Sequence, residues 1–306
     1  MLQGFQKTIS EPTQLEGVGL HNGIKVNIFL KPAEANSGIT FKRIDIEDGK
    51  NIIEANYKNV SSPVLCTKIK NSHGTTISTI EHLMAAFYGE GIDNILVEID
   101  APEVPIMDGS AFDFVEAIRS AGTENQNYLR KFIKVIKKVE AKDGPKYISI
   151  EPLKNDLIID FEVIYKNPLI RTRRKEFKLS NSDLTSVYNS RTFCLYEDID
   201  KIKSYGLAKG GSLDNAIVVK ENEILNEDGL RHRDEFVEHK ILDCLGDIML
   251  SGHRVFGHIK TSQGGHQLTN TLLMKFFSDK SNWEFETIEV KKDIENNYTS
   301  SIAVNV

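Results

Sequence analysis

DEFVEHKILDCLGDIML, residues 234–250, has the apolar spacing of an amphipathic helix. At about 100° per residue, the ionisable side chains of His239, Asp243 and Asp247 lie within roughly 80° of one another on one face of that helix. Gly246 lies beside them and costs about 1 kcal/mol in helix propensity relative to Ala, so we expect something to approach the helix backbone closely there. The spacing alone fits both a polar face in water and half of a catalytic site. The opposite face is apolar, with Val237, Ile241, Cys244, Leu245 and Ile248.

A second helix of the same kind is predicted in the first third of the chain. EHLMAAFYGEGIDNILVEI from Glu81 and EHKILDCLGDIMLSGHRVFGHI from Glu238 both begin with Glu-His, continue for about three apolar turns and lead into a strand. Strands precede helices in both halves of the chain. We therefore expect an α+β protein of two related domains that face each other across a cleft, where any chemistry would lie.

The domain boundary is expected in GTENQNYLR, residues 122–130, a polar stretch without periodicity. The first domain is then residues 1–125 and the second residues 131–290. Residues 194–222 are expected to form an inserted βαβ element. Strands are predicted at 24–30, 38–46, 94–99, 131–141, 146–153, 156–165, 172–180 and from Ser281 on, and helices at 79–88, 110–121, 233–250 and 267–278.

The charge balance argues against a nucleic-acid partner. The 306 residues include 38 Lys and Arg against 44 Asp and Glu, a net charge of −6, whereas phosphate binding depends on clustered positive charge. No run reaches the roughly 18 apolar residues of a membrane span, and the start lacks the apolar core of a secretory signal, so we expect a cytoplasmic protein. The cysteines are too few and too widely spaced for a disulfide framework or a zinc ribbon, and we expect reduced thiols at Cys66, Cys194 and Cys244.

Two further histidines suit metal-assisted hydrolysis. His82 lies inside an apolar helix next to Glu81, and His266 follows two glycines at the start of another helix. A zinc site for hydrolysis needs about three N or O ligands, an open position for water, a carboxylate to take the proton of that water and a group that meets the oxyanion. For His82 alone, a hydrogen-bonded core histidine is the competing interpretation. The required set is supplied by His82, His239, Asp243, Glu81 and His266.

Several common motifs are absent from the sequence. It contains neither His-Glu-x-x-His nor Gly-x-Ser-x-Gly, so it is neither an ordinary zincin nor an enzyme with a serine nucleophile elbow. GVGLHNG, residues 17–23, misses the dinucleotide-binding spacing by one residue and leads into a strand, which predicts a turn. KGGS, residues 209–212, lacks the Gly-Lys-Ser/Thr ending of a Walker motif.

Seven blocks of sequence occur in the order typical of one known family. They are GVGLHNG (17–23), STIEHLMA (78–85), PIMDGS (105–110), RTF (191–193), LNEDGL (225–230), EFVEHKILDCLGD (235–247) and GH (265–266). Together they resemble the UDP-3-O-acyl-N-acetylglucosamine deacetylases, zinc amidases that perform the committed step of lipid A synthesis. The resemblance covers about residues 3–290 and implies two similar two-layer domains, each a small sheet packed on helices, with the active site between them. The tail after about residue 290 matches no motif.

The resemblance implies a role for each member of the site. His82, His239 and Asp243 would hold zinc, although iron(II) suits the same ligands. Glu81 would act as the general base. His266 would be protonated, stabilise the oxyanion and protonate the leaving amine, while Asp247 would keep it cationic. Thr192 would direct its hydroxyl at the oxyanion, and only the resemblance distinguishes it from an ordinary strand residue.

The resemblance also implies a UDP-glucosamine substrate with a 3-O-hydroxyacyl chain and an N-acetyl group that leaves as acetate. Lys240, His21, Lys146 and Tyr165 match or lie near positions that bind the nucleotide and the sugar phosphate. Insertion 194–222 would wall an acyl passage, although Lys209 departs from the apolar residue typical there, so the acyl length stays open. For Lys240 and Cys66, a solvent lysine and plain core packing are the competing interpretations. The remaining candidate substrate contacts are Leu65, Cys66, Phe193, Ile199, Gly210 and Ser212.

Two other functions compete with this interpretation. The same site could cleave a different N-acyl amine, which an assay on simple N-acetyl sugars would reveal. Two-layer α+β domains also occur in non-catalytic RNA-associated proteins, but the net charge of −6 and the lack of a basic run disfavour RNA. We expect a monomer, and the sequence chooses neither the metal nor the source organism.

Overall fold

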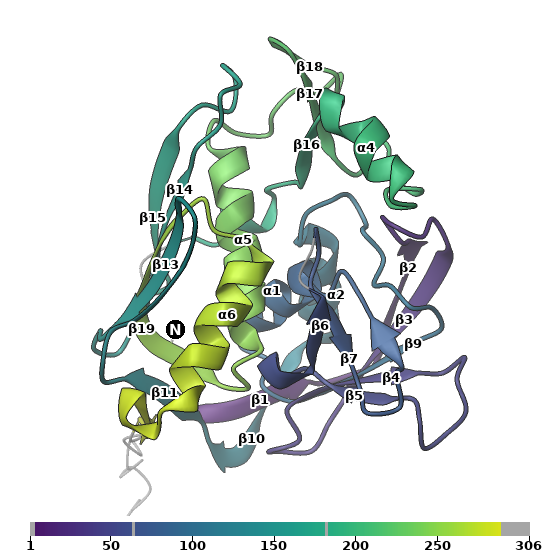
Figure 1. Cartoon of the computed structure of the whole chain (residues 1–306). Coiled ribbons are helices and arrows are strands. Elements are labelled where there is room, and N and C mark those ends of the chain that lie inside the picture. The colour runs from purple at the N-terminus through teal and green to yellow at the C-terminus, as the bar shows by residue number, and fades with distance from the viewer. Residues whose placement is uncertain (1–3, 63–64, 181–182, 289–306) are drawn as a thin grey trace, which may run out of the picture.

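Two β-sheets stand on either side of a central pair of helices, α1 (Glu81–Glu90) and α5 (Glu235–Met249) (Figure 1). The computed structural model describes residues 4–62, 65–180 and 183–288. Its elements form an α+β fold of small sheets packed on helices, which confirms the expected fold class. Among the described residues, no helix combines the length and the apolar character needed to cross a bilayer.

The N-terminal half is built on a five-stranded sheet. Its elements are β1 (Phe5–Ile9), β2 (Thr13–Val18), β3 (Lys25–Pro32), β4 (Ile39–Arg43), β5 (Ile52–Glu54), η1 (Tyr57–Asn59), β6 (Val60–Ser62), β7 (Lys68–Lys70), β8 (Thr76–Ile77), β9 (Ile95–Ile99) and α2 (Phe112–Ala121). The sheet has the order β2-β3-β9-β4-β5. Alternation in the sequence explains the buried face of β3, because Val26, Ile28 and Leu30 are fully buried and the residues between them are not. Helix α1 ends at Gly91, which takes the left-handed conformation of a C-terminal cap.

The C-terminal half contains the larger, seven-stranded sheet. Its elements are β11 (Lys131–Val135), β12 (Val139–Asp143), β13 (Lys146–Glu151), β14 (Leu157–Val163), β15 (Arg173–Lys178), α3 (Thr185–Tyr188), β19 (Arg254–Ser262), α6 (His266–Ser278), η3 (Lys280–Asn282) and β20 (Trp283–Thr287). The order is β12-β13-β19-β11-β20, and β14 joins β19 to β15. Helices α5 and α6 pack on this sheet, and α5 also packs against α1 (Figure 1). The strand expected from Ser281 on is confirmed as β20.

The strand that follows each Glu-His helix occupies the same place in its sheet. Strand β9 follows α1 and lies between antiparallel β3 and parallel β4. Strand β19 follows α5 and lies between antiparallel β13 and parallel β11. The internal similarity of the sequence therefore has a structural counterpart.

A small unit stands above the rest of the molecule in Figure 1. It consists of β16 (Phe193–Leu195), η2 (Tyr196–Asp198), α4 (Ile199–Ser204), β17 (Ile217–Lys220) and β18 (Glu223–Ile224). Strands β16 and β17 are parallel and are joined through α4, and β18 returns antiparallel to β17. The insertion expected at 194–222 falls within this unit.

Three local predictions differ from the structure. Residues 122–130 were expected to be irregular but contain strand β10 (Thr123–Leu129), which pairs with β1; its side chains are mostly exposed, so no apolar pattern marks it. The single strand expected at 131–141 is two strands, β11 and β12. The helix expected from residue 79 begins at Glu81, because Thr79 takes a positive φ of 57°. The tail after about residue 290 lies outside the described residues.

Candidate active site

Helices α1 and α5 meet at Gly246, where a side chain would not fit. A Cβ atom at Gly246 would lie 2.0 Å from the carbonyl oxygen of Glu81, so the first residue of α1 packs directly on the backbone of α5. The close approach expected at this glycine is confirmed. Every residue of α5 except Lys240 is buried, which rules out the solvated polar face.

Three buried side chains from these two helices converge on one point. His82 Nε2 and His239 Nε2 each lie 3.4 Å from Oδ1 of Asp243. Their ligand atoms all lie within 4.8 Å of one another, and the two imidazole rings meet edge to face with centroids 5.0 Å apart. Two imidazoles and a carboxylate suit zinc or iron(II), so these residues fit a divalent cation.

His239 is held in the form that binds a metal. Its Nδ1 lies 3.0 Å from the Ser190 carbonyl oxygen. A carbonyl only accepts hydrogen bonds, so Nδ1 has the hydrogen and Nε2 keeps its lone pair. Burial lowers the pKa of His239 to about 3, which leaves the ring neutral. Burial opposes the charge of Asp243, but His239 and Lys240 beside it hold the pKa of Asp243 well below its usual range.

Glu81 lies next to the ligands and has partners on both carboxylate oxygens. Its Oε2 accepts a hydrogen bond from the backbone N–H of Thr67 at 3.0 Å, and its Oε1 lies 3.7 Å from His266 Nε2. Burial raises the pKa of Glu81, and His266 opposes that rise. A buried carboxylate with a raised pKa is suited to accept a proton from water.

His266 and Asp247 form an ion pair on the other side of Glu81. His266 Nδ1 lies 2.8 Å from Asp247 Oδ2. Burial works against the imidazolium, but the carboxylates of Asp247 and Glu81 outweigh it and raise the pKa of His266 to about 10. His266 is therefore protonated at neutral pH. The hydroxyl of Thr67 donates to Asp247 Oδ1 at 2.6 Å, so Thr67 contacts both acidic groups.

A cavity of about 40 Å³ opens onto this cluster. Thr192 and His21 line it together with the three candidate ligands, Glu81, Lys240 and His266. Both ring nitrogens of His21 are buried without a hydrogen-bond partner, so His21 has donor and acceptor capacity free for a bound molecule. The structure thus brings together all seven residues expected to bind metal or act in catalysis. Six of them line the cavity, and the seventh, Asp247, contacts His266.

Sequence comparisons identify the family to which the chain is similar. The family model described as UDP-3-O-acyl N-acetylglycosamine deacetylase matches residues 6–278. The chain belongs to this deacetylase family. A relative from Actinobacillus succinogenes, named UDP-3-O-acyl-N-acetylglucosamine deacetylase, is 43% identical over 297 residues, which cover 96% of this chain and 97% of that protein. A relative of the same name from Haemophilus influenzae is 41% identical over 302 residues, 98% of each chain.

A larger apolar cavity of about 390 Å³ lies beside the deacetylase site. Its lining includes Leu65, Phe193, Ile199 and Ser212, four of the residues expected to contact substrate. His21 and Thr192 line both this cavity and the smaller one, so the two spaces adjoin.

Two expected wall residues lie behind the cavity surface. The backbone N–H of Gly210 donates to the Leu20 carbonyl oxygen at 3.0 Å, and a Cβ there would lie 2.3 Å from the Gly19 carbonyl oxygen. Gly210 therefore packs the insertion against the 17–23 turn. Cys66 is buried, and burial raises the pKa of its thiol to about 12, so it remains protonated.

The three residues expected to bind the nucleotide have different surroundings in the structure. Lys146 is exposed and lines a cavity of about 180 Å³ that also includes His266. Tyr165 packs edge to face against Phe193, with centroids 5.7 Å apart, and lines none of the cavities described above. The ammonium of Lys240 lies 2.8 Å from Asp243 Oδ2.

Glu103 is a site component that has no signal in the sequence. Its carboxylate accepts hydrogen bonds from the backbone N–H groups of His21 and Asn22, at 2.8 and 2.9 Å, and from the Thr79 hydroxyl at 2.9 Å. One buried carboxylate thereby fixes both the turn that presents His21 and the segment that leads into α1. Thr67 and Glu103 act through contacts with residues distant along the chain, which residue spacing cannot reveal.

Proposed function

We propose that the protein hydrolyses the N-acetyl group of UDP-3-O-(3-hydroxyacyl)-N-acetylglucosamine and releases acetate, the deacetylation step of lipid A biosynthesis. Membership of the deacetylase family supports the substrate class. The observation on which the proposal chiefly rests is the buried cluster of His82, His239 and Asp243 with Glu81 and His266 beside it. Such a cluster supplies ligands, a base and an acid for amide hydrolysis.

The metal of this reaction is proposed to be zinc. His82, His239 and Asp243 would hold it, and the same donor set accepts iron(II). When bound, the cation lowers the pKa of water and polarises the amide carbonyl.

The side chains around the ligands would then move the protons. Glu81 accepts a proton from the water that attacks the acetyl carbonyl. The imidazolium of His266 and the hydroxyl of Thr192 donate hydrogen bonds to the oxyanion that develops. His266 next gives its proton to the departing glucosamine nitrogen as the amide C–N bond breaks, and Asp247 supports its cationic form. Acetate and the free amine are the products.

The remaining contacts would recognise the two ends of the substrate. The apolar cavity beside the site suits the acyl chain, with Leu65, Phe193, Ile199 and Ser212 in its wall. His21, Lys240 and Lys146 suit the phosphates, and Tyr165 stays a predicted uracil contact. We also propose that residues 1–125 and 131–290 are two domains with the site between them. The monomeric state and the cytoplasmic location stay predictions.

Acetate release tests the function directly. The purified protein, assayed before and after chelation and metal addition, should release acetate from the UDP-linked acylated sugar much faster than from simple N-acetyl sugars. Equal rates on both would instead support an amidase of a different substrate class. Elemental analysis of the active protein identifies the metal.

A further inference from the structure

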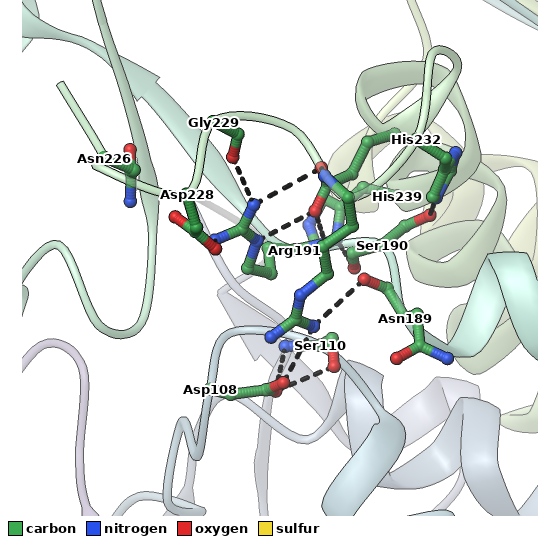
Figure 2. Close-up of polar contacts among 12 residues, drawn as sticks. Asp108, Ser110, Asn189, Ser190, Arg191, Asn226, Asp228, Gly229, His232 and His239 are labelled. Carbon is green, nitrogen blue, oxygen red and sulfur yellow. Dashed lines mark hydrogen bonds and ion pairs between the residues drawn. The ribbon is translucent and has the colours of Figure 1, made fainter. Parts of the chain in front are cut away.

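Three of the seven sequence blocks meet at one place, and apart from Thr192 and Phe193 their residues have no role in the chemistry described above. They are residues 105–110, the RTF block at 191–193 and residues 225–230. Figure 2 shows Arg191 between Asp228 and Gly229 on one side and Ser190 and His239 on the other. The blocks come from distant parts of the chain, so a shared network beside a candidate ligand calls for a physical explanation.

Arg191 is the centre of this network. It is only 3% exposed, and its guanidinium donates to acceptors on several sides. Nε donates to Glu235 Oε1 at 2.9 Å, Nη1 to Asp228 Oδ2 at 2.9 Å, and Nη2 to the Gly229 carbonyl at 2.7 Å. Glu235, which is fully buried, also accepts from the backbone N–H of Arg191 at 3.2 Å. Side chain and backbone of Arg191 are thus fixed by one carboxylate.

The two neighbours of Arg191 in sequence both face the active site. The carbonyl of Ser190 accepts the hydrogen bond from His239 Nδ1 at 3.0 Å. Thr192 lines both cavities, and its backbone N–H donates to the Gly109 carbonyl at 2.8 Å. Movement of Arg191 would therefore shift a carbonyl that orients a candidate ligand and a residue, Thr192, proposed to contact the oxyanion.

A second arginine ties the network to the N-terminal half. Arg231 forms an ion pair with Asp108 at 2.8 Å and donates to the Asn189 carbonyl at 3.1 Å. The backbone N–H of Arg231 also donates to Glu235 at 2.7 Å. Segment 189–192 is consequently held from the 105–110 block, from the 225–230 block and from α5.

We infer that Arg191 is a positioning residue that, through Glu235, fixes the Ser190 carbonyl on His239 and the Thr192 hydroxyl in the cavity. Acceptors behind a ligating histidine set its tautomer and ring orientation, and their loss typically lowers metal affinity or activity 10 to 100-fold. A buried ion pair contributes little net stability compared with apolar side chains of the same size, which favours a geometric role over a purely stabilising one. The inference rests on the proposed function.

Arg191→Met and Arg191→Lys test the inference, with Arg130→Met as the matched control. Arg130 is also 3% exposed and donates both to a carboxylate, Asp93 at 2.6 Å, and to a carbonyl, that of Gly91 at 2.9 Å. Those contacts lie at the C-terminal end of α1, roughly 15 Å along the helix from Glu81. The dissociation constant of Zn²⁺ is measured by chelator competition on each purified protein, followed by kcat and KM for the UDP-linked substrate.

Arg191→Met should weaken Zn²⁺ binding about 10 to 100-fold and lower kcat by a similar factor with KM nearly unchanged. Arg191→Lys, which keeps the charge but not the planar fork, should lose part of the same affinity. Arg130→Met should keep both constants within about twofold of the wild type. Unchanged Zn²⁺ affinity and kcat in folded Arg191→Met, or equal losses in Arg130→Met, would overturn the inference. If Arg191→Met is insoluble, the Zn²⁺ affinity and kcat of Arg191→Lys test the inference instead.

The outcome is separable from that of the proposed function. If the wild-type protein binds Zn²⁺ but releases no acetate from the UDP-linked sugar, the proposed substrate is wrong. The comparison of Zn²⁺ affinities between Arg191→Met and Arg130→Met would still decide the role of Arg191, because it requires no turnover.

Discussion

Glu81 and His266 face each other across 3.7 Å, yet burial and charge prepare them for opposite tasks. Burial raises the pKa of Glu81, and so makes its carboxylate a better proton acceptor. Two carboxylates keep His266 protonated and make it a donor. Pairs of groups whose surroundings favour different protonation states are the usual mark of a general acid and a general base.

Glu81→Gln should therefore lose turnover without losing metal. Gln keeps the size of the side chain but cannot accept the proton, so we expect kcat to fall about 10²-fold or more. Metal content, measured by elemental analysis, should stay at the wild-type level. His239→Ala is the contrasting variant and should lose the metal itself. Full activity in Glu81→Gln would assign the base to another residue.

The pH dependence of turnover should report His266. Asp247 and Glu81 raise its pKa to about 10, so the acid form persists well above neutral pH. Asp247→Asn removes the nearer carboxylate, and the alkaline limb of the kcat profile should move down by about one pH unit or more. An alkaline limb at the same pH in both proteins would contradict the role of Asp247.

The same pair predicts how stability varies with pH. The folded state holds the His266 proton more tightly than the unfolded chain, in which the imidazole titrates near 6.5. The stabilisation is fully present below pH 6.5 and is lost as the pH rises towards 10. Thermal unfolding should therefore show the advantage of the wild type over Asp247→Asn shrinking across that window.

From residue spacing alone, site residues were predictable only where one helix places them together. His239 and Asp243 follow from the period of α5. His82 required the internal similarity and the family resemblance, since one histidine in an apolar helix is ambiguous. Thr67 contacts Glu81 through a backbone N–H, which has no residue signature at all.

At the scale of elements, the packing of α1 on α5 depends on the missing side chain of Gly246. Gly246→Ala gains about 1 kcal/mol in helix propensity, but its Cβ would lie 2.0 Å from the Glu81 carbonyl oxygen. Overpacking of this kind costs about 1–3 kcal/mol, so we expect net destabilisation in denaturant unfolding together with weaker metal binding. Ser120→Ala, exposed on α2, is the control and should change neither.

The insertion should control acyl length through Ile202 of α4, which lines the large cavity. Ile202→Trp fills part of that space and should exclude the end of a long chain. Loss of two buried methylenes costs about 1.6 kcal/mol, so KM for long-chain substrates should rise about tenfold or more. Short-chain substrates should be unaffected. Lys201→Trp, on the exposed side of the same helix, should alter neither KM.

Long periodic elements were predictable, whereas short or exposed ones were not. Helices α5 and α6 begin and end within two residues of their expected bounds, because each has a full apolar stripe. Strand β10 was missed because backbone pairing with β1 holds it, and its polar side chains contain no alternating pattern. Helix α3, four residues long, is too short for any period to appear.

For the whole molecule, metal removal should loosen the join between the two halves. The ligands lie on α1 and α5, so a bound cation links both halves in the folded state only. A ligand present at 100 times its Kd stabilises the folded state by about 2.7 kcal/mol, which raises Tm by several degrees. Chelation should therefore lower the Tm of the wild type and leave that of His239→Ala unchanged. The same fall in both proteins would place the stabilising metal elsewhere.

The separation of the ligands along the chain also governs when the enzyme can mature. His239 is synthesised 157 residues after His82. At about 5–20 residues per second the gap is roughly 8 to 30 seconds. The N-terminal half supplies one of the three candidate ligands, His82. The complete set of candidate ligands therefore exists only after α5 has been synthesised, so a chain that ends before α5 lacks two of the three ligands of this site.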